Sequence, residues 1–165
     1  MFIGREEELK FLDDRYNSAD GQLVVLYGRR RVGKTELLRQ FCQNKEHIFY
    51  TCTEIIDDKQ LEAFSQRLLE KNQQAAKYIT RFSDWEQALL SITELAKDKK
   101  IVVVIDEFPY MVKGNNAIPS ILQKLWDEVL KQSNVMLILC GSAMSFIEKE
   151  VLAEKIVVFI VKHRC

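Results

Sequence analysis

Three stretches of the chain are apolar at nearly every position: LVVLY at 23–27, IVVVI at 101–105 and VMLILC at 135–140. A strand with apolar residues on both faces has to be covered on both faces. Segments with apolar residues at helical spacing lie between these runs, which favours an α/β fold with a parallel sheet and helices on either side. Ligands of such sheets bind beyond the carboxyl ends of the strands. The residues that follow each run are therefore the first candidates for a binding site.

The same patterns predict the other elements. We expect helices at 6–18, 34–42, 59–71, 84–97, 118–131 and 143–153. We expect strands at 22–27, 47–52, 101–105, 135–140 and 156–161. Ser83 or Asp84 is the expected N-cap of its helix, and Pro119 falls in a first turn, where proline is tolerated.

Composition limits the class of protein. A chain of 165 residues suffices for one domain with a core. Lys and Arg (24) balance Asp and Glu (24), so there is no overall cationic signal for nucleic acid or membrane. No run approaches the roughly 20 apolar residues of a membrane span, and the acidic N-terminus does not resemble a secretory signal. The four cysteines lie far apart, so we expect small core residues and one tail thiol, in a cytoplasmic protein.

The residues after the first apolar run fit the pattern GxxxxGK[ST] without a gap, between a strand and a helix. Glycines permit close approach, successive amide groups form an anion-binding nest, and the lysine neutralises β- and γ-phosphates. The predicted nucleotide-binding residues are Gly28, Arg29, Arg30, Arg31, Val32, Gly33, Lys34, Thr35 and Glu36. The alternative is a glycine turn without a ligand. The three arginines are equally well explained by phosphate or partner contacts and by solvated loop charge.

The run at 101–105 ends in Asp106 and Glu107, as in a Walker B segment. We expect Thr35 and Asp106 to hold Mg²⁺, and Glu107 to polarise the attacking water. The alternative is a strand that ends in surface acids. The guanine-recognition patterns of GTPases are missing from the sequence, which favours ATP. After the run at 135–140, Ser142 is a candidate for contact with the γ-phosphate or the water, or for a helix N-cap.

Four ordered segments, FIGREEELKFL, GRRRVGKTELL, VVVIDEFPY and LILCGSAMSF, resemble archaeal and bacterial AAA-type ATPases of the P-loop superfamily. More narrowly, they resemble ATP-binding proteins often joined to a C-terminal nuclease-like domain. The resemblance implies a three-layer P-loop NTPase fold with a mostly parallel, five-stranded sheet flanked by helices. It implies that the Walker B and post-fourth-strand segments flank the P-loop strand. It also implies that Phe2, Gly4 and Arg5 lie near the adenine or ribose.

The last residues, VLAEKIVVFIVKHRC, do not match this family. We therefore expect residues 1–165 to form an ATPase core truncated before the helical lid, with an atypical tail at 151–165. Lid contacts and a partner's arginine finger are not provided for by the sequence, and Arg164 is a poor substitute.

The sequence thus predicts an enzyme that hydrolyses ATP to ADP and phosphate with Mg²⁺, slowly in this lidless form, with Glu107, Lys34 and Ser142 as catalytic residues. One alternative is a nucleotide-dependent switch or assembly module that binds another protein or forms a homo-oligomer. A DNA-associated ATPase is the other, and it rests on family analogy and on the three loop arginines. We expect no membrane partner.

Overall fold

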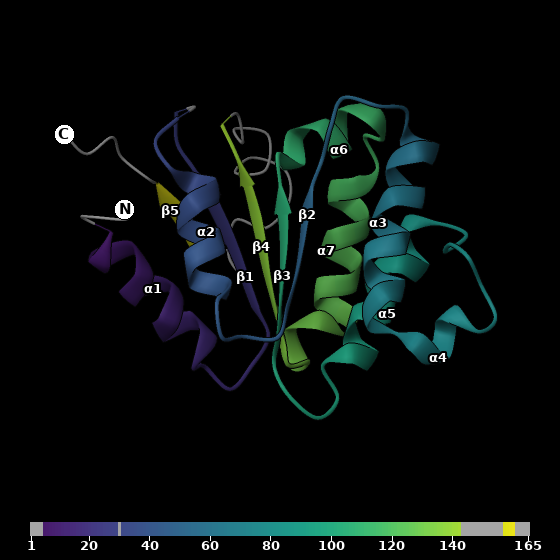
Figure 1. Ribbon diagram of the computed structural model, residues 1–165, viewed down its shortest axis with the longest axis horizontal. Helices are drawn as coiled ribbons and strands as arrows, with labels where there is room; N and C mark the ends of the chain where they lie inside the picture. Colours follow the sequence, from purple (N-terminus) through teal and green to yellow (C-terminus); the bar gives the residue numbers. More distant parts are fainter. Residues whose placement is uncertain (1–4, 30, 143–156, 161–165) are drawn as a thin grey trace.

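The computed structural model describes residues 5–29, 31–142 and, as backbone, 157–160. Its centre is a parallel sheet with the strand order β2-β3-β4-β1-β5 (Figure 1). The strands are β1 (Gln22–Tyr27), β2 (His47–Thr51), β3 (Ile101–Asp106), β4 (Val135–Gly141) and the short β5 (Val157–Ile160). Every neighbouring pair is parallel. The predicted α/β fold with a parallel sheet flanked by helices is confirmed.

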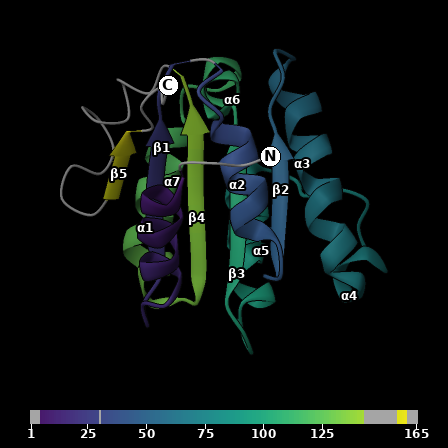
Figure 2. The same ribbon diagram turned by 60° about the vertical axis from the view of Figure 1, so that its left-hand side comes forward.

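Helices cover both faces of the sheet (Figures 1 and 2). One face carries α1 (Glu6–Tyr16) and α2 (Lys34–Cys42), and the other carries α3 (Asp57–Lys71), α5 (Trp85–Leu95) and α7 (Ile118–Glu128). Successive residues of a strand point to opposite faces, so Val24 packs in the α1–α2 core and Val25 in the core of the other three helices. This two-sided burial is the physical reason for the apolar runs.

Several helix boundaries in the structure differ from the predicted ones. Asp84 is the N-cap of α5, and its carboxylate accepts a hydrogen bond of 2.8 Å from the Gln87 amide. The helix predicted to reach residue 131 ends at Glu128 and continues as a short 3₁₀ turn, η1 (Leu130–Gln132). Two short helices, α4 (Gln73–Ala76) and α6 (Phe108–Gly114), were not predicted. The helix predicted at 143–153 lies outside the described residues.

The strand order corrects one implication of the resemblance. The Walker B strand β3 does not flank the P-loop strand β1, because β4 lies between them. Leu137 of β4 pairs with Leu23 of β1 on one side and with Val103 of β3 on the other. All seven residues of β4 are buried, as a central position requires. Only one of the two segments, that of β4, is a direct neighbour of β1.

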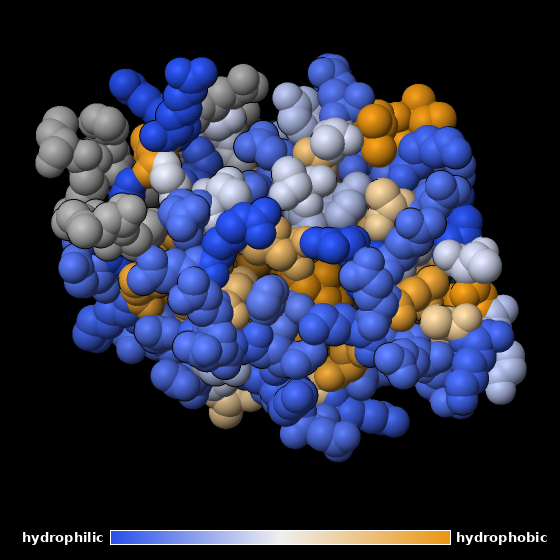
Figure 3. Space-filling view, viewed as in Figure 1, coloured by the Kyte–Doolittle hydropathy of each residue, from blue (hydrophilic) through white to orange (hydrophobic). Residues whose placement is uncertain are grey.

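The surface in Figure 3 is mostly hydrophilic, with separate apolar patches. The exposed large apolar side chains of the described residues are Ile55, Ile56, Tyr78, Ile79 and Leu90. In the part of the chain described, no helix has both the length and the apolar character needed to cross a membrane. The predicted core position of the cysteines is confirmed for Cys42, Cys52 and Cys140, which are buried free thiols.

Candidate nucleotide-binding site

The loop from β1 to α2 closes around Lys34, the first residue of α2. The Lys34 side chain is only 7% exposed, and its Nζ donates to the carbonyl oxygens of Gly28 (2.7 Å) and Arg29 (2.8 Å). Gly33 has φ 90°, a left-handed conformation that side chains rarely adopt, which explains the glycine there. The loop is therefore folded around an ammonium group at the amino end of a helix.

The two predicted halves of the site meet at Asp106. The Thr35 hydroxyl donates to Asp106 Oδ2 at 2.8 Å, although the two residues are 71 positions apart. The other carboxylate oxygen, Oδ1, accepts the Glu107 backbone N–H at 2.9 Å, and Asp106 is 2% exposed. Hydroxyl and carboxylate oxygens are the ligands that a hard cation such as Mg²⁺ takes. Thr35 and Asp106 are thus a fitting donor pair for this ion.

The Cys140 thiol of β4 is buried close to Asp106. Burial and the neighbouring Asp106 carboxylate raise the pKa of this thiol, so it stays protonated at neutral pH. The Lys34 ammonium acts on the pKa of the same thiol in the opposite direction. Lys34 and Asp106 therefore both lie close enough to the Cys140 thiol to affect its pKa.

Glu107 follows β3 in a left-handed conformation, with φ 54° and ψ 40°. Such angles are uncommon and strained for a residue other than glycine, and they cluster at functional sites. Glu107 is half-buried and opens α6. The strained backbone at Glu107 therefore makes this residue a candidate for a functional role.

Both motifs open into one pocket of about 610 Å³. The described residues that line it are Arg31, Gly33, Lys34, Thr35, Glu36, Glu107 and Tyr110. Tyr110 was not predicted as a site residue. It lies in the first turn of α6. Because α6 was not predicted, no pattern in the sequence indicated that Tyr110 would face the pocket.

Arg5, Arg29 and Ser142 are predicted residues that the structure describes outside the pocket lining. The buried Arg5 guanidinium donates to the Val32 carbonyl oxygen, which places Arg5 against the loop. Arg29 is exposed. Ser142 directly follows β4 and is half-buried, and it is not among the described residues that line the pocket. Phe2, Gly4, Arg30 and Arg164 lie outside the described residues.

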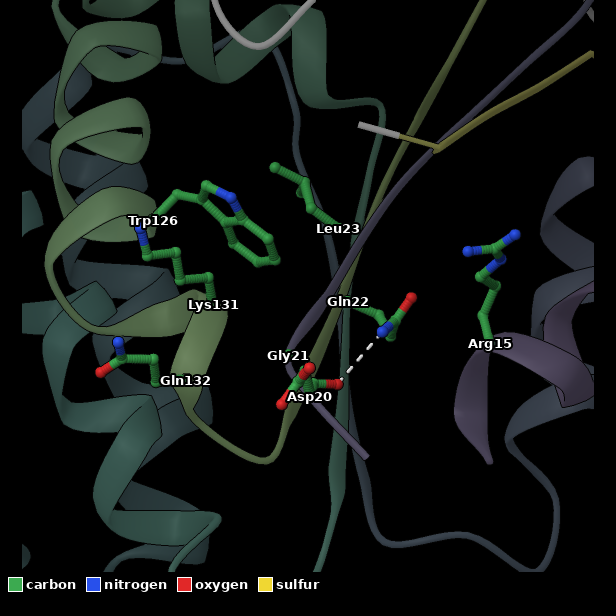
Figure 4. Close-up of a pocket in the computed structure, with 8 residues that line it drawn as sticks. All are labelled: Arg15, Asp20, Gly21, Gln22, Leu23, Trp126, Lys131 and Gln132. Atoms are coloured by element: carbon green, nitrogen blue, oxygen red, sulfur yellow. Dashed lines mark hydrogen bonds between the residues drawn. The ribbon is translucent and has the colours of Figure 1, made fainter. Parts of the chain in front are cut away.

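A second pocket, of about 500 Å³, lies at the opposite end of β1 (Figure 4). It is lined from the first residues of β1 and from α1, α7 and η1, where Arg15, Trp126 and Lys131 contribute side chains. The Gln22 amide donates to the Asp20 carbonyl at 3.1 Å beside it. None of the predicted site residues lines this pocket, so the candidate site is the one at the carboxyl ends of the strands.

The fold and the pocket together define a P-loop ATPase domain. The chain belongs to a family described as an ATPase domain predominantly from Archaea, whose model matches residues 2–157. An uncharacterized protein of Methanocaldococcus jannaschii is 36% identical over 155 residues, which is 94% of this chain and 33% of that protein. An uncharacterized ATP-binding protein of the same organism is 52% identical over 46 residues, 28% of this chain and 78% of that protein.

Solved structures share the fold. The Walker-type ATPase PABY2304 of Pyrococcus abyssi has a TM-score of 0.69 at 22% identity, covering 98% of this chain and 54% of that one. Cdc6p of Pyrobaculum aerophilum has a TM-score of 0.64 at 17% identity, covering 96% and 46%. The chain therefore spans about half of these structures and a third of the longer M. jannaschii relative. The nuclease-like domain of the resemblance stays a prediction.

Proposed function

We propose that this domain binds ATP with Mg²⁺ in the pocket between the P-loop and Glu107 and hydrolyses it to ADP and phosphate. The observation that supports this most is the 2.8 Å hydrogen bond from Thr35 to Asp106 beside the buried Lys34. It joins the two segments on which a magnesium–nucleotide site depends. Association with a second copy, another protein or DNA stays a prediction of the resemblance.

Binding rests on Lys34 and the loop. In the part of the chain described, no carboxylate forms an ion pair with Lys34, so its charge is available to the β- and γ-phosphates. The amino end of α2, a helix of nine residues, adds backbone N–H groups directed at the same place. Thr35 and Asp106 would hold the metal, which supplies charge neutralisation on the β- and γ-oxygens.

Glu107 would carry the chemical step. Its carboxylate orients a water molecule and accepts one of its protons, while the water oxygen forms a bond to the γ-phosphorus. The bond from the γ-phosphorus to the β–γ bridging oxygen breaks, and its electron pair stays on ADP. The proton on Glu107 then passes to the released phosphate or to solvent, which restores the carboxylate.

The substitution Glu107→Gln tests this assignment. Loss of a general base costs about 10²- to 10⁴-fold in rate, so we expect hydrolysis to fall by at least about 10²-fold. Calorimetry should show ATP affinity within about threefold of the unsubstituted chain, because Glu107 acts after binding. Glu94→Gln, on the exposed side of α5, is the matched control. Unchanged hydrolysis in Glu107→Gln would refute the role of Glu107.

Binding of Mg-ATP without hydrolysis would point to a different function. Should the unsubstituted chain bind Mg-ATP and not release phosphate, the nucleotide-dependent switch replaces the enzyme as the function of this pocket. Phosphate release and ATP binding are therefore measured on the same preparation.

A further inference from the structure

We propose that Arg31 is a catalytic arginine supplied by the P-loop of the same chain, and that its guanidinium stabilises the charge on the γ-phosphoryl group during hydrolysis. This inference rests on the proposed ATP hydrolysis and adds to it a cation that would stabilise the charge of the transition state. Such a cation contributes about 10³- to 10⁵-fold to the rate in related chemistry, whether it comes from the same chain or from a partner.

The first observation is position. Arg31 lines the same pocket as Lys34, Thr35 and Glu107, so its side chain borders the space assigned to the phosphates and the attacking water. Both arginines are exposed, but Arg29, two residues earlier, is not among the described residues lining that pocket. The loop therefore distinguishes between two of its arginines.

The second observation is that the guanidinium is available. Among the described residues, Arg31 forms no hydrogen bond or ion pair, even though Glu36 and Glu107 line the same pocket. Arginine presents several N–H groups in a planar fork that matches phosphate oxygens. An arginine without a described partner, bordering the pocket of about 610 Å³ that Lys34 also lines, has the donors to bind an equatorial oxygen pair.

The third observation is backbone strain. Arg31 has φ 65°, in the left-handed region where a β-carbon is crowded and glycine is free. A side chain at such a position costs stability that glycine would not, and such residues mark functional sites. An arginine that only carries a solvated charge needs no such strain, and Arg29 has no positive φ. Strain and position together favour a specific role for the Arg31 side chain.

The test compares Mg-ATP hydrolysis by Arg31→Ala, Arg31→Lys, Arg31→Gly and the control Arg81→Ala; Arg81 pairs with Asp58 and Glu62 and does not line the pocket. We expect Arg31→Ala and Arg31→Gly to lose about 10³-fold in kcat, and Arg31→Lys to recover only part, because lysine lacks the fork. Arg81→Ala should stay within about threefold. Arg31→Gly relieves the backbone strain, so full activity in that variant would show a purely structural role and overturn the inference.

A binding measurement gives a readout besides activity. The complex of Mg-ADP with aluminium fluoride mimics the planar γ-phosphoryl group, and we expect the unsubstituted chain to bind it more tightly than Mg-ADP. Arg31→Ala should abolish that difference and leave Mg-ADP affinity unchanged. The inference would be overturned if Arg31→Ala preferred the aluminium fluoride complex over Mg-ADP as strongly as the unsubstituted chain does. It would also be overturned if the unsubstituted chain bound the two equally well.

Mixing two inactive chains decides which molecule supplies the arginine. Arg31→Ala retains Glu107, and Glu107→Gln retains Arg31. If Arg31 acts on its own site, the mixture stays as inactive as its components, whereas recovery of activity would place Arg31 in a neighbour's site and refute the same-chain assignment. Loss of hydrolysis in Glu107→Gln with full activity in Arg31→Ala would refute Arg31 alone and leave the proposed ATPase intact.

Discussion

The carboxylate of Asp106 connects the two halves of the site. It is buried at the end of β3, and it accepts hydrogen bonds from the Thr35 hydroxyl and from the Glu107 amide. A carboxylate held by two donors has a fixed orientation, so its oxygens are already placed for a metal ion. This is why a single residue carries much of the proposed magnesium dependence.

At the scale of single residues, the substitution Asp106→Asn should reduce the effect of Mg²⁺ on ATP binding. The amide keeps the shape of the side chain but loses the negative charge, so we expect the Mg²⁺-induced gain in affinity to fall by about tenfold or more. Calorimetric titrations of ATP with and without Mg²⁺ measure this gain. The control is Asp98→Asn, an exposed residue before β3. The same gain in Asp106→Asn as in the control would contradict the metal assignment.

At the scale of elements, the start of β1 is held tightly against η1. The Gly21 N–H donates to the Lys131 carbonyl at 3.1 Å, and a β-carbon on Gly21 would lie 2.0 Å from the Leu130 carbonyl oxygen. A backbone atom at that distance cannot rotate away as a side chain can. Gly21 is therefore required by a close approach of two backbones, which fixes where β1 enters the sheet.

We expect Gly21→Ala to lower the free energy of unfolding by about 2–3 kcal/mol, because one of the two backbones must shift. The matched control is Gly114→Ala at the end of α6, where a β-carbon would meet no atom closer than 3.5 Å. Urea unfolding of the two variants measures the difference. Equal stability of the two variants would show that the start of β1 can relax at no cost.

The elements that could be predicted are those with a clear apolar pattern. β1, β3 and β4 were predictable because each is buried from both sides, and α2 because its apolar residues recur at helical spacing. By contrast, α6 begins with Phe108 and Pro109 and has only seven residues, too few to repeat a pattern. Proline at the start of a helix is a real signal, but it does not by itself distinguish a helix from a turn.

At the scale of the whole molecule, the strand order could not be predicted from hydrophobicity. The runs in β1, β3 and β4 are similarly apolar, so the pattern places all three in the interior and does not say which pair are neighbours. The motif residues Lys34, Thr35 and Asp106 could be predicted because their chemistry is local to a strand end. The contact of Arg5 with the Val32 carbonyl could not, since it depends on how α1 reaches the loop.

The central claim is that the parallel sheet brings Lys34 and Asp106, from two distant segments, into one magnesium–nucleotide site. Calorimetric titration of Mg-ATP into the unsubstituted chain, into Lys34→Ala and into the control Lys113→Ala tests it most directly; Lys113 is an exposed lysine paired with Glu54. The account predicts one equivalent bound by the unsubstituted chain and by the control, and affinity weakened by at least about tenfold in Lys34→Ala. Equal affinity in all three chains, or no binding in any, would contradict it.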